Sequence, residues 1–591
     1  MNKVDTRIIF LGLILIFILF LVFSCVPVTY KPGMSFGPAE AFWARRTLAK
    51  MTIEEKAGQM IVGRYSGYFV NRHSEYFKEL EKLIVERKIG GLIIFGGEVY
   101  ETAILTNTFQ KLAKIPLLIA SDFERGAGNQ IKRAIEFPPL MAMGAAGSEE
   151  LVYLMGKITA LEGRAMGIHM TYAPVVDVNI NPENPIINTR SFGEDPELVS
   201  RLAKAFIKGC QENGVIATAK HYPGHGDTDL DSHTHLPTVN ADLERLEKIE
   251  LYPFRQAVEA GVQAIMTAHL YVPALDPTPN LPATLSPVIL TDLLRKKFGF
   301  KGIIVTDAME MGGITTRYEP EEAALMAVKA GVDMVLLPPK TNEVIDALIQ
   351  AVKSGEIPEE RINVSVKRIL EAKARIGLHR NRLVDVEPLS ETIARNERVR
   401  IAERMFESSM TLVKNVGDIL PLSDASKSIA VFSLSSDPGD YFAGRAFVRE
   451  VEKRCQNVVS FYADSATGDE FIQEAVKIAE KAEVMVFALF SNLSAWKGSV
   501  DLEPRHIKLV KEMVEGERPV VVVSFGSPYF LRHFPDVDSY LCAYRNVPEA
   551  QVAAVKAVFG EIDVRGKLPV SLPGLFPIGH GIELHKKNTT Q

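Results

Sequence analysis

The run Val215-Ile-Ala-Thr-Ala-Lys220, followed directly by His221, is mostly apolar and then ends in two polar, titratable residues. Similar short runs lie on both sides of it, most of them separated by enough chain for a helix: 59–63, 91–95, 117–121, 170–178, 264–268, 302–306 and 333–337. Repeated strand–helix units predict an α/β fold with a parallel sheet, and eight of them favour a closed (β/α)8 barrel of the TIM type. An open doubly wound sheet has the same periodicity and remains the alternative.

Polar residues follow several of these predicted strands. They are Ser121-Asp122-Phe-Glu124-Arg125, Asp177-Val-Asn179, Lys220-His221, His269 and Thr306-Asp307. In a (β/α)8 enzyme, the carboxyl ends of the strands form the active-site face. Each group by itself could be a structural polar residue, so we base the expectation of a site on their convergence at one face.

The densest polar segment is Lys220-His-Tyr-Pro-Gly-His-Gly-Asp-Thr-Asp-Leu-Asp-Ser-His-Thr-His235. Its aspartates imitate the start of a calcium loop, but Ser232 and Thr238 stand where that loop needs glycine and glutamate. Its histidines could bind zinc, but no HExxH-type helix frames them. We therefore predict no metal site.

The same segment also has the features of a proton-transfer loop. Gly224 and Gly226 give its backbone conformational freedom, so we expect it to swing over a pocket. Asp231 and His233 can meet in a turn, where a carboxylate would fix the imidazole tautomer and raise its basicity. The alternative is a purely structural loop held together by His–Asp hydrogen bonds.

A polar, arginine-rich stretch at 379–400 predicts a linker after a barrel at 41–378. Beyond it, β-rich runs recur at 429–433, 458–462, 484–490, 520–525 and 540–544, with helical patterns at 469–482 and 506–515. This alternation predicts a second domain at 401–591, an α/β sandwich with an open sheet between helices.

The N-terminus has the pattern of an export signal. Lys3 and Arg7 precede an apolar run over 8–23, which ends at Ser24-Cys25. We expect 1–25 to be a lipoprotein-type signal with Cys25 as the lipidated residue, and the proline-containing stretch 26–40 to be a tether. An uncleaved anchor helix is the alternative, and both interpretations place the protein outside the cytoplasm and attached to a membrane, in the cell envelope or periplasm.

The charge and the cysteine content give no indication of nucleic-acid binding, metal binding or a disulfide-rich fold. The formal net charge is −6 and no basic stripe interleaved with aromatics is present, so we expect no nucleic-acid binding. The four cysteines of the chain match no metal spacing and make no dense disulfide framework. Oligomeric state cannot be read from these features.

The segment Lys220-His-Tyr-Pro-Gly-His-Gly-Asp-Thr…Asp231-Ser-His233 closely resembles the signature of glycoside hydrolase family 3 β-N-acetylglucosaminidases. The resemblance extends over nearly the whole mature chain, through the segments 51–60, 181–196, 266–269 and 305–311 and into the second domain. It implies a retaining exo-β-N-acetylglucosaminidase that acts on GlcNAc-containing glycans such as peptidoglycan fragments, and it implies no cofactor.

The resemblance also implies roles for individual residues. Asp307 would be the nucleophile, and Asp231 with His233 would be the acid/base dyad. The residues implied to hold the hydroxyls and acetamido group of the sugar are Asp122, Arg190, Lys220 and His221.

Several departures leave alternatives open. The β-glucosidases of this family use a glutamate in the second domain, but Lys497 falls near that position and Glu503 is the nearest substitute. The usual Asp-x-Glu-Gly-Gly-Arg segment is altered after Asp122, so Arg125 and Arg133 compete as sugar ligands.

Alternatives remain for Arg190 and for the activity as well. Arg190 could instead pair with Glu194 or Asp195. The alternative activities are a family 3 β-glucosidase or a GlcNAc phosphorylase, since a neutral histidine does not repel phosphate, and a non-catalytic sugar-binding lipoprotein.

Overall fold

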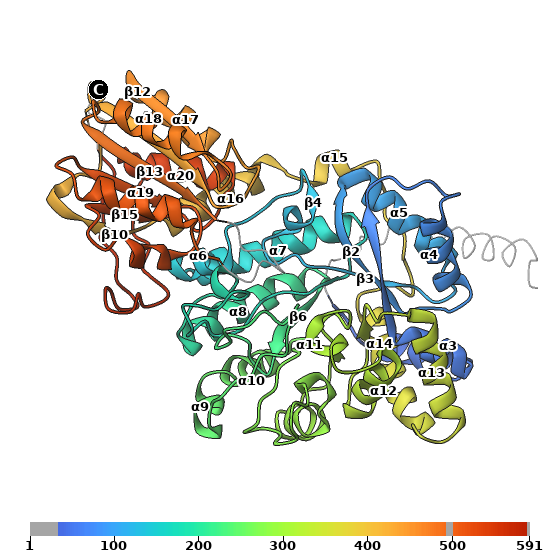
Figure 1. The fold of residues 1–591 in the computed structure, drawn as a ribbon. Helices are drawn as coiled ribbons and strands as arrows, with labels where there is room; N and C mark the ends of the chain where they lie inside the picture. The colour runs from blue at the N-terminus through green and yellow to red at the C-terminus, as the bar shows by residue number, and fades with distance from the viewer. Residues whose placement is uncertain (1–33, 423, 492–499, 588–591) are drawn as a thin grey trace, which may run out of the picture. The chain divides into compact units, whose positions relative to one another are not determined.

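The computed structural model describes residues 34–422, 424–491 and 500–587 (Figure 1). Its first sheet has nine parallel strands: eight form a barrel, and the short β4 (Ile131–Lys132) pairs with β2 beside it. The barrel strands are β1 (Ile61–Gly67), β2 (Gly91–Glu98), β3 (Leu118–Ser121), β5 (Met170–Thr171), β6 (Ile216–Tyr222), β7 (Ala264–Thr267), β8 (Ile303–Val305) and β9 (Val335–Leu336). Each pairs with the next, β9 pairs with β1, and a bridge between Val305 and Met334 joins the remaining edges. The predicted TIM-like barrel is therefore confirmed, and the open doubly wound sheet is wrong.

Helices follow the strands and cover the outside of the barrel. They are α4 (Glu75–Val85), α5 (Val99–Leu112), α7 (Glu149–Ala165), α8 (Pro196–Glu212), α10 (Tyr252–Glu259), the π-helix η4 (Val288–Lys297), α12 (Pro320–Ala330), α13 (Thr341–Lys353) and α14 (Glu359–Arg375). Because helices cover one face of the sheet and side chains fill the other, every residue of β6 is buried. This is why the strands are nearly continuous apolar runs in the sequence.

The strand expected over 170–178 is much shorter in the structure. Only Met170 and Thr171 pair as a strand, and a single bridge from Val175 to Lys220 continues the contact. Pro174 has no backbone N–H to donate to a neighbouring strand, which explains the interruption. The prediction for this strand was wrong in length.

The second domain contains a six-stranded sheet with the order β10-β15-β14-β13-β11-β12. Its strands are β10 (Thr411–Asn415), β11 (Ser428–Ser435), β12 (Asn457–Ala463), β13 (Val484–Phe490), β14 (Val520–Ser524) and β15 (Ser539–Cys542). Only β10 runs antiparallel to its neighbour, and the sequence analysis missed this strand. Helices α16 (Asn396–Ser409), α17 (Arg445–Glu452) and α20 (Pro548–Val558) contribute to one core, and α18 (Asp469–Ala479) and α19 (Pro504–Val514) to another. The predicted α/β sandwich is confirmed.

Hydrogen bonds join the two domains close to the barrel strand ends. The Asn179 side chain donates to the Tyr529 hydroxyl at 3.1 Å, and the backbone N–H of Glu194 donates to the carbonyl of Pro569 at 3.0 Å. Glu194 also accepts a hydrogen bond from Ser571 at 2.8 Å. The second domain is thus held against the face where the barrel is expected to carry its site.

The predicted signal, Cys25 and most of the tether lie outside the described residues. In the part of the chain that is described, no helix has the length and apolar character needed to cross a membrane.

Candidate active site

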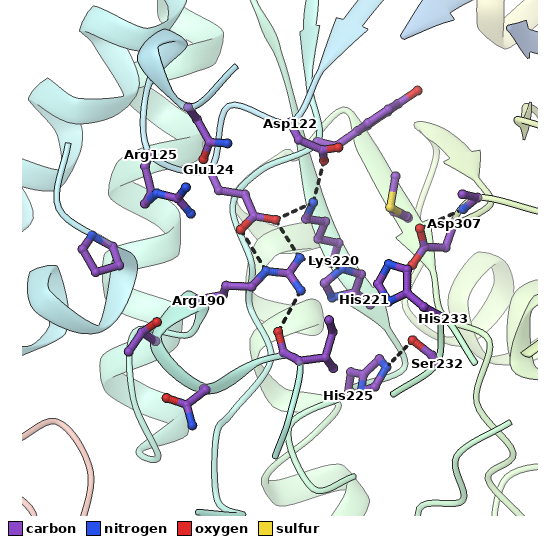
Figure 2. Close-up of a pocket in the computed structure, with 18 of the residues that line it drawn as sticks. Asp122, Glu124, Arg125, Arg190, Lys220, His221, His225, Ser232, His233 and Asp307 are labelled. Atoms are coloured by element: carbon purple, nitrogen blue, oxygen red, sulfur yellow. Dashed lines mark hydrogen bonds and ion pairs between the residues drawn. The ribbon is translucent and has the colours of Figure 1, made fainter. Parts of the chain in front are cut away.

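A cavity of about 380 Å³ lies at the carboxyl ends of the barrel strands. It is lined by all four expected sugar ligands, by Asp307 and by His233 (Figure 2). Asp231 does not line it but contacts the His233 ring. Ser491, Phe525, Tyr544 and Arg545 of the second domain also line it. Its size suits a small ligand such as a monosaccharide unit.

Two cations and two carboxylates form a network in this cavity. Lys220 Nζ lies 2.8 Å from Asp122 Oδ1 and 2.7 Å from Glu124 Oε1. Arg190 binds Glu124 through both Nε at 3.0 Å and Nη2 at 2.7 Å. Burial opposes ionisation of Glu124, but Arg190 and Lys220 hold its pKa well below the ordinary value. Both cations therefore remain charged and fixed before any substrate arrives.

Arg190 does not use either of the acidic partners that sequence proximity suggested. Asp195 accepts hydrogen bonds at the N-terminus of α8, and Glu194 contacts the second domain. The alternative pairing with Glu194 or Asp195 is therefore wrong. Glu124, 66 residues away in sequence, takes that place because β3 and the segment after β5 are neighbours in the barrel.

His221 is held by a buried carboxylate. Its Nδ1 lies 2.7 Å from Asp177 Oδ2, and its backbone N–H donates to the same carboxylate. Its Nε2 lies 3.3 Å from Arg190 Nη2, and because a guanidinium only donates, Nε2 accepts in this arrangement. Asp177 thus sets the orientation of a ring that faces the cavity.

The Asp231–His233 pair has the geometry expected of a dyad. Asp231 Oδ1 lies 2.7 Å from His233 Nδ1 and also accepts the backbone N–H of His233 at 2.8 Å. The Asp231 side chain is buried, whereas 22% of the His233 side chain is exposed. Since Nδ1 is held by the carboxylate, proton exchange with a ligand falls to Nε2.

Asp307 follows β8, and its carboxylate is held by the neighbouring residue Ala308, which His269 also contacts. The backbone N–H of Ala308 donates to Asp307 Oδ1 at 2.8 Å, and His269 Nε2 lies 3.1 Å from the Ala308 carbonyl. Burial by itself would raise the pKa of Asp307, but the neighbouring His221 and His269, the Ala308 N–H and Lys220 together lower it. The carboxylate is therefore ionised and available as a nucleophile or electrostatic stabiliser.

The two arginines left open by the sequence differ in position. Arg125 lines the cavity and binds Glu136 at 3.1 Å, with 18% of its side chain exposed. Arg133 is 88% exposed and does not line the cavity. Arg125 is therefore the arginine that can meet a ligand.

Sequence reasoning did not select three residues that organise the site: Asp177, Glu124 and His225. Asp177 and Glu124 were among the polar residues expected to converge at the strand ends, but neither was given a role of its own. His225 was considered only as one of the loop histidines that could bind zinc.

The polar loop is anchored more firmly than its two glycines suggested. His225 is buried and bridges Thr228 at 2.8 Å and Ser232 at 2.9 Å, and burial lowers its pKa to about 4. A Cβ on Gly226 would lie 1.8 Å from the carbonyl oxygen of Val178. Gly226 thus permits a close backbone approach, which differs from the swinging motion we expected of it.

Substitution of Gly226 by alanine should destabilise this loop. The added Cβ must push the loop away from Val178, so we expect the free energy of unfolding to fall by about 1–3 kcal/mol and kcat/KM to fall with it. Gly468→Ala is a matched control, since a Cβ there meets no atom within 4 Å. Chemical denaturation and initial rates of both variants test this, and equal values for the two would contradict it.

Both domains match models of a single family. "Glycosyl hydrolase family 3 N terminal domain" matches residues 52–372, and "Glycosyl hydrolase family 3 C-terminal domain" matches residues 410–579. The chain belongs to glycosyl hydrolase family 3. It is a hydrolase of that family, and the sequence-based resemblance is confirmed.

Several proteins of known name resemble this family 3 chain over most of its length. Beta-hexosaminidase A of Pseudoalteromonas piscicida is 34% identical over 550 residues, which cover 84% of this chain and 91% of that protein. The structure of a family 3 beta-N-acetylglucosaminidase from Paenibacillus sp. str. FPU-7 has 33% identity and a TM-score of 0.79, covering 88% of this chain and 99% of that one. A beta-glucoside phosphorylase has 26% identity and a TM-score of 0.81, covering 91% and 97%.

Lys497 and Glu503 were considered at the position where the family's β-glucosidases have a glutamate. Lys497 lies outside the described residues. Glu503 precedes α19 and donates its backbone N–H to Ser436, and it does not line the described cavity. Glu503 therefore does not contact the cavity formed by the described residues.

Proposed function

We propose that this family 3 hydrolase is a retaining exo-β-N-acetylglucosaminidase, which removes terminal β-linked GlcNAc through a glycosyl-aspartate intermediate. The observation that carries the proposal is the presence of Asp307 and of the Asp231–His233 pair in one cavity with four sugar-binding candidates. The hexosaminidase-named relatives favour the same sugar.

The first step forms the covalent intermediate. An oxygen of Asp307 attacks the anomeric carbon as the bond to the leaving oxygen breaks, and the electron pair of that bond goes to the leaving oxygen. His233 Nε2 gives its proton to that oxygen, while Asp231 stabilises the imidazolium before transfer and fixes the tautomer. The charge that develops on the ring is close to the ionised Asp307 carboxylate.

The second step releases the sugar. Neutral His233 takes a proton from water, whose oxygen attacks the anomeric carbon from the face opposite Asp307 and displaces the carboxylate. Two inversions leave the configuration unchanged. A histidine suits this exchange because its ordinary pKa lies near neutral pH.

The remaining residues would hold the sugar. Asp122 accepts from hydroxyl groups, and Lys220 and Arg190 donate from fixed positions. His221, oriented by Asp177, adds a further contact. The ion pairs order these groups in advance, so binding does not have to organise them.

Release of nitrophenol from an aryl N-acetyl-β-glucosaminide tests this proposal. We expect turnover with excess EDTA and without phosphate, and a kcat/KM at least about tenfold above that for the aryl β-glucoside. Free GlcNAc with retained configuration should be the product, as nuclear magnetic resonance can show. No turnover, or an absolute requirement for phosphate, would refute hydrolysis, and an equal rate on glucoside would refute the sugar assignment.

Phosphorolysis is the second candidate, supported by the similarity to a beta-glucoside phosphorylase and by a dyad that is not a carboxylate pair. Phosphate would then take the place of water, and the product would be a sugar 1-phosphate. Addition of phosphate to the same assay distinguishes the two products.

The natural substrate and location are also part of the proposal. The signal-like N-terminus favours an exported, membrane-tethered enzyme that trims GlcNAc from peptidoglycan fragments. Labelling with a lipid precursor, lost on Cys25→Ala, would test the tether.

A further inference from the structure

Three residues that line the cavity have buried polar atoms without a partner among the described residues. These atoms are Nδ2 of Asn188, Oδ1 of Asn129 and Nε of Arg545, and all three residues line the cavity. Asn188 is only 1% exposed and is held at a φ of 38°. Buried polar groups in proteins are almost always hydrogen-bonded, so the two unpaired donors, Asn188 Nδ2 and Arg545 Nε, call for an acceptor group in the cavity.

The cavity has an excess of positive charge where Arg125 and Arg545 meet. Arg125 and Arg545 both bind Oε1 of Glu136, each at 3.1 Å. Burial, together with the charge of Arg125, lowers the pKa of Arg545 to about 10, which leaves it protonated at neutral pH. One carboxylate cannot neutralise two guanidinium groups, so one positive charge remains.

The arginine pair is separate from the groups proposed to react. Glu124 is already neutralised by Arg190 and Lys220, so it does not cancel the remaining charge of the arginine pair. In Figure 2, Arg125 lies across Glu124 and Arg190 from Asp307 and His233. A group bound beside Arg125 is therefore remote from the anomeric carbon.

We propose that Arg125, Arg545 and Asn188 form a subsite for an oxyanion, a phosphate or carboxylate group, carried by the sugar away from its anomeric carbon. Planar guanidinium groups match the geometry of such groups, and Arg545 Nε and the Asn188 amide supply unpaired N–H donors. This inference rests on the proposed function, because it assumes that the enzyme cleaves β-N-acetylhexosaminides. It narrows this substrate class to those in which the sugar carries an acidic group. The subsite joins Arg125 and Asn188 of the barrel with Arg545 of the second domain, so both domains contribute to it.

Calorimetric binding of monosaccharides to the full chain tests the subsite without requiring turnover. The probes are three sugars. N-acetylglucosamine carries no oxyanion, its 6-phosphate carries a phosphate at C6, and N-acetylmuramic acid carries a carboxylate on the substituent at O3. We expect at least one acidic sugar to bind about tenfold more tightly than N-acetylglucosamine, as charge-assisted hydrogen bonds predict. Failure of both acidic sugars to bind more tightly would overturn the proposal.

Variants localise the effect. Arg125→Gln and Arg545→Gln should reduce the preference for the acidic sugar to within about twofold, while Arg133→Gln, an exposed arginine outside the cavity, should retain it. Glu136→Gln should increase the preference, because it removes the carboxylate that competes for both arginines. If these residues had only a structural role, the substitutions would not change the preference for acidic sugars in opposite directions. An unchanged preference in both Arg125→Gln and Glu136→Gln would therefore overturn the proposal, even if Arg545→Gln failed to fold.

Inorganic phosphate distinguishes the source of the oxyanion. If phosphate alone displaces the acidic sugar but not N-acetylglucosamine, the subsite is supported and also accepts the free ion. If phosphate instead accelerates aryl release and yields sugar 1-phosphate, the anion acts at the Asp307 end and the remote placement is overturned. Hydrolysis of the neutral aryl substrate is measured separately, so failure of the proposed function remains distinguishable from failure of the subsite.

Discussion

Asp307→Asn should lower kcat/KM on an aryl N-acetyl-β-glucosaminide by at least about 10⁴-fold. Asparagine keeps the shape and can still meet the Ala308 N–H through its amide oxygen, but it is a poor nucleophile and carries no charge. The other two carboxylates in the cavity network, Asp122 and Glu124, cannot replace it because both are paired with Lys220, and Glu124 also with Arg190. Initial rates together with a thermal unfolding curve separate lost chemistry from lost folding.

A trapping experiment identifies the nucleophile directly. A fluorinated donor sugar with a good leaving group should add its mass to the peptide that contains Asp307 in the wild type and not in Asp307→Asn. Label on another residue, or more than about a tenth of wild-type activity in the variant, would contradict the assignment.

At low pH, the decrease of kcat/KM should report protonation of the Asp307 carboxylate. Because the surrounding positive groups lower the pKa of Asp307 below its ordinary value of 3.8, the nucleophile stays ionised until the pH falls below that value. Loss of kcat/KM at a higher pH would then report another group.

His233→Ala should lower kcat/KM by about 10²–10⁴-fold on substrates with poor leaving groups. The loss should be much smaller on a dinitrophenyl glycoside, because that leaving group departs without protonation. Hydrolysis of the glycosyl-enzyme should then be slow, since no base activates water, and added azide should restore turnover and give a β-glycosyl azide. The measurement is kcat/KM across a series of leaving groups, with and without azide.

His235→Ala is the matched control for this substitution. His235 is two residues further along the same loop, is exposed and does not line the described cavity. It should retain near wild-type rates for every leaving group. An equal loss in both variants, or an absence of azide rescue in His233→Ala, would refute the acid/base role.

The second domain contributes to the cavity as well as to stability. Its residues Phe525, Tyr544 and Arg545 line the cavity, and Asn179 at a barrel strand end binds Tyr529. The sequence left open how closely this domain approaches the site. The answer matters for specificity, because side chains from both domains meet any ligand there.

The sequence by itself determined the α/β class, the sandwich and the motif residues, and it favoured the barrel over an open sheet. Buried strands of a covered parallel sheet must be apolar on both faces, so the predicted barrel runs stand out without any structure. The run interrupted by Pro174 was the most overestimated, and the run at 333–337 was also too long, since only Val335–Leu336 pair as a strand. The Asp231–His233 contact was also predictable, because residues two apart in a turn are necessarily close.

Only the tertiary structure decided the contacts between distant segments. Arg190 with Glu124, Asp177 with His221, and Arg125 with Arg545 through Glu136 join residues far apart in the chain. Local sequence patterns record hydrophobic period and turn chemistry, but the partner of a charged side chain depends on which strand ends the closed barrel brings together. For this reason the sequence suggested the wrong partner for Arg190, and only the folded chain reveals two arginines sharing one carboxylate.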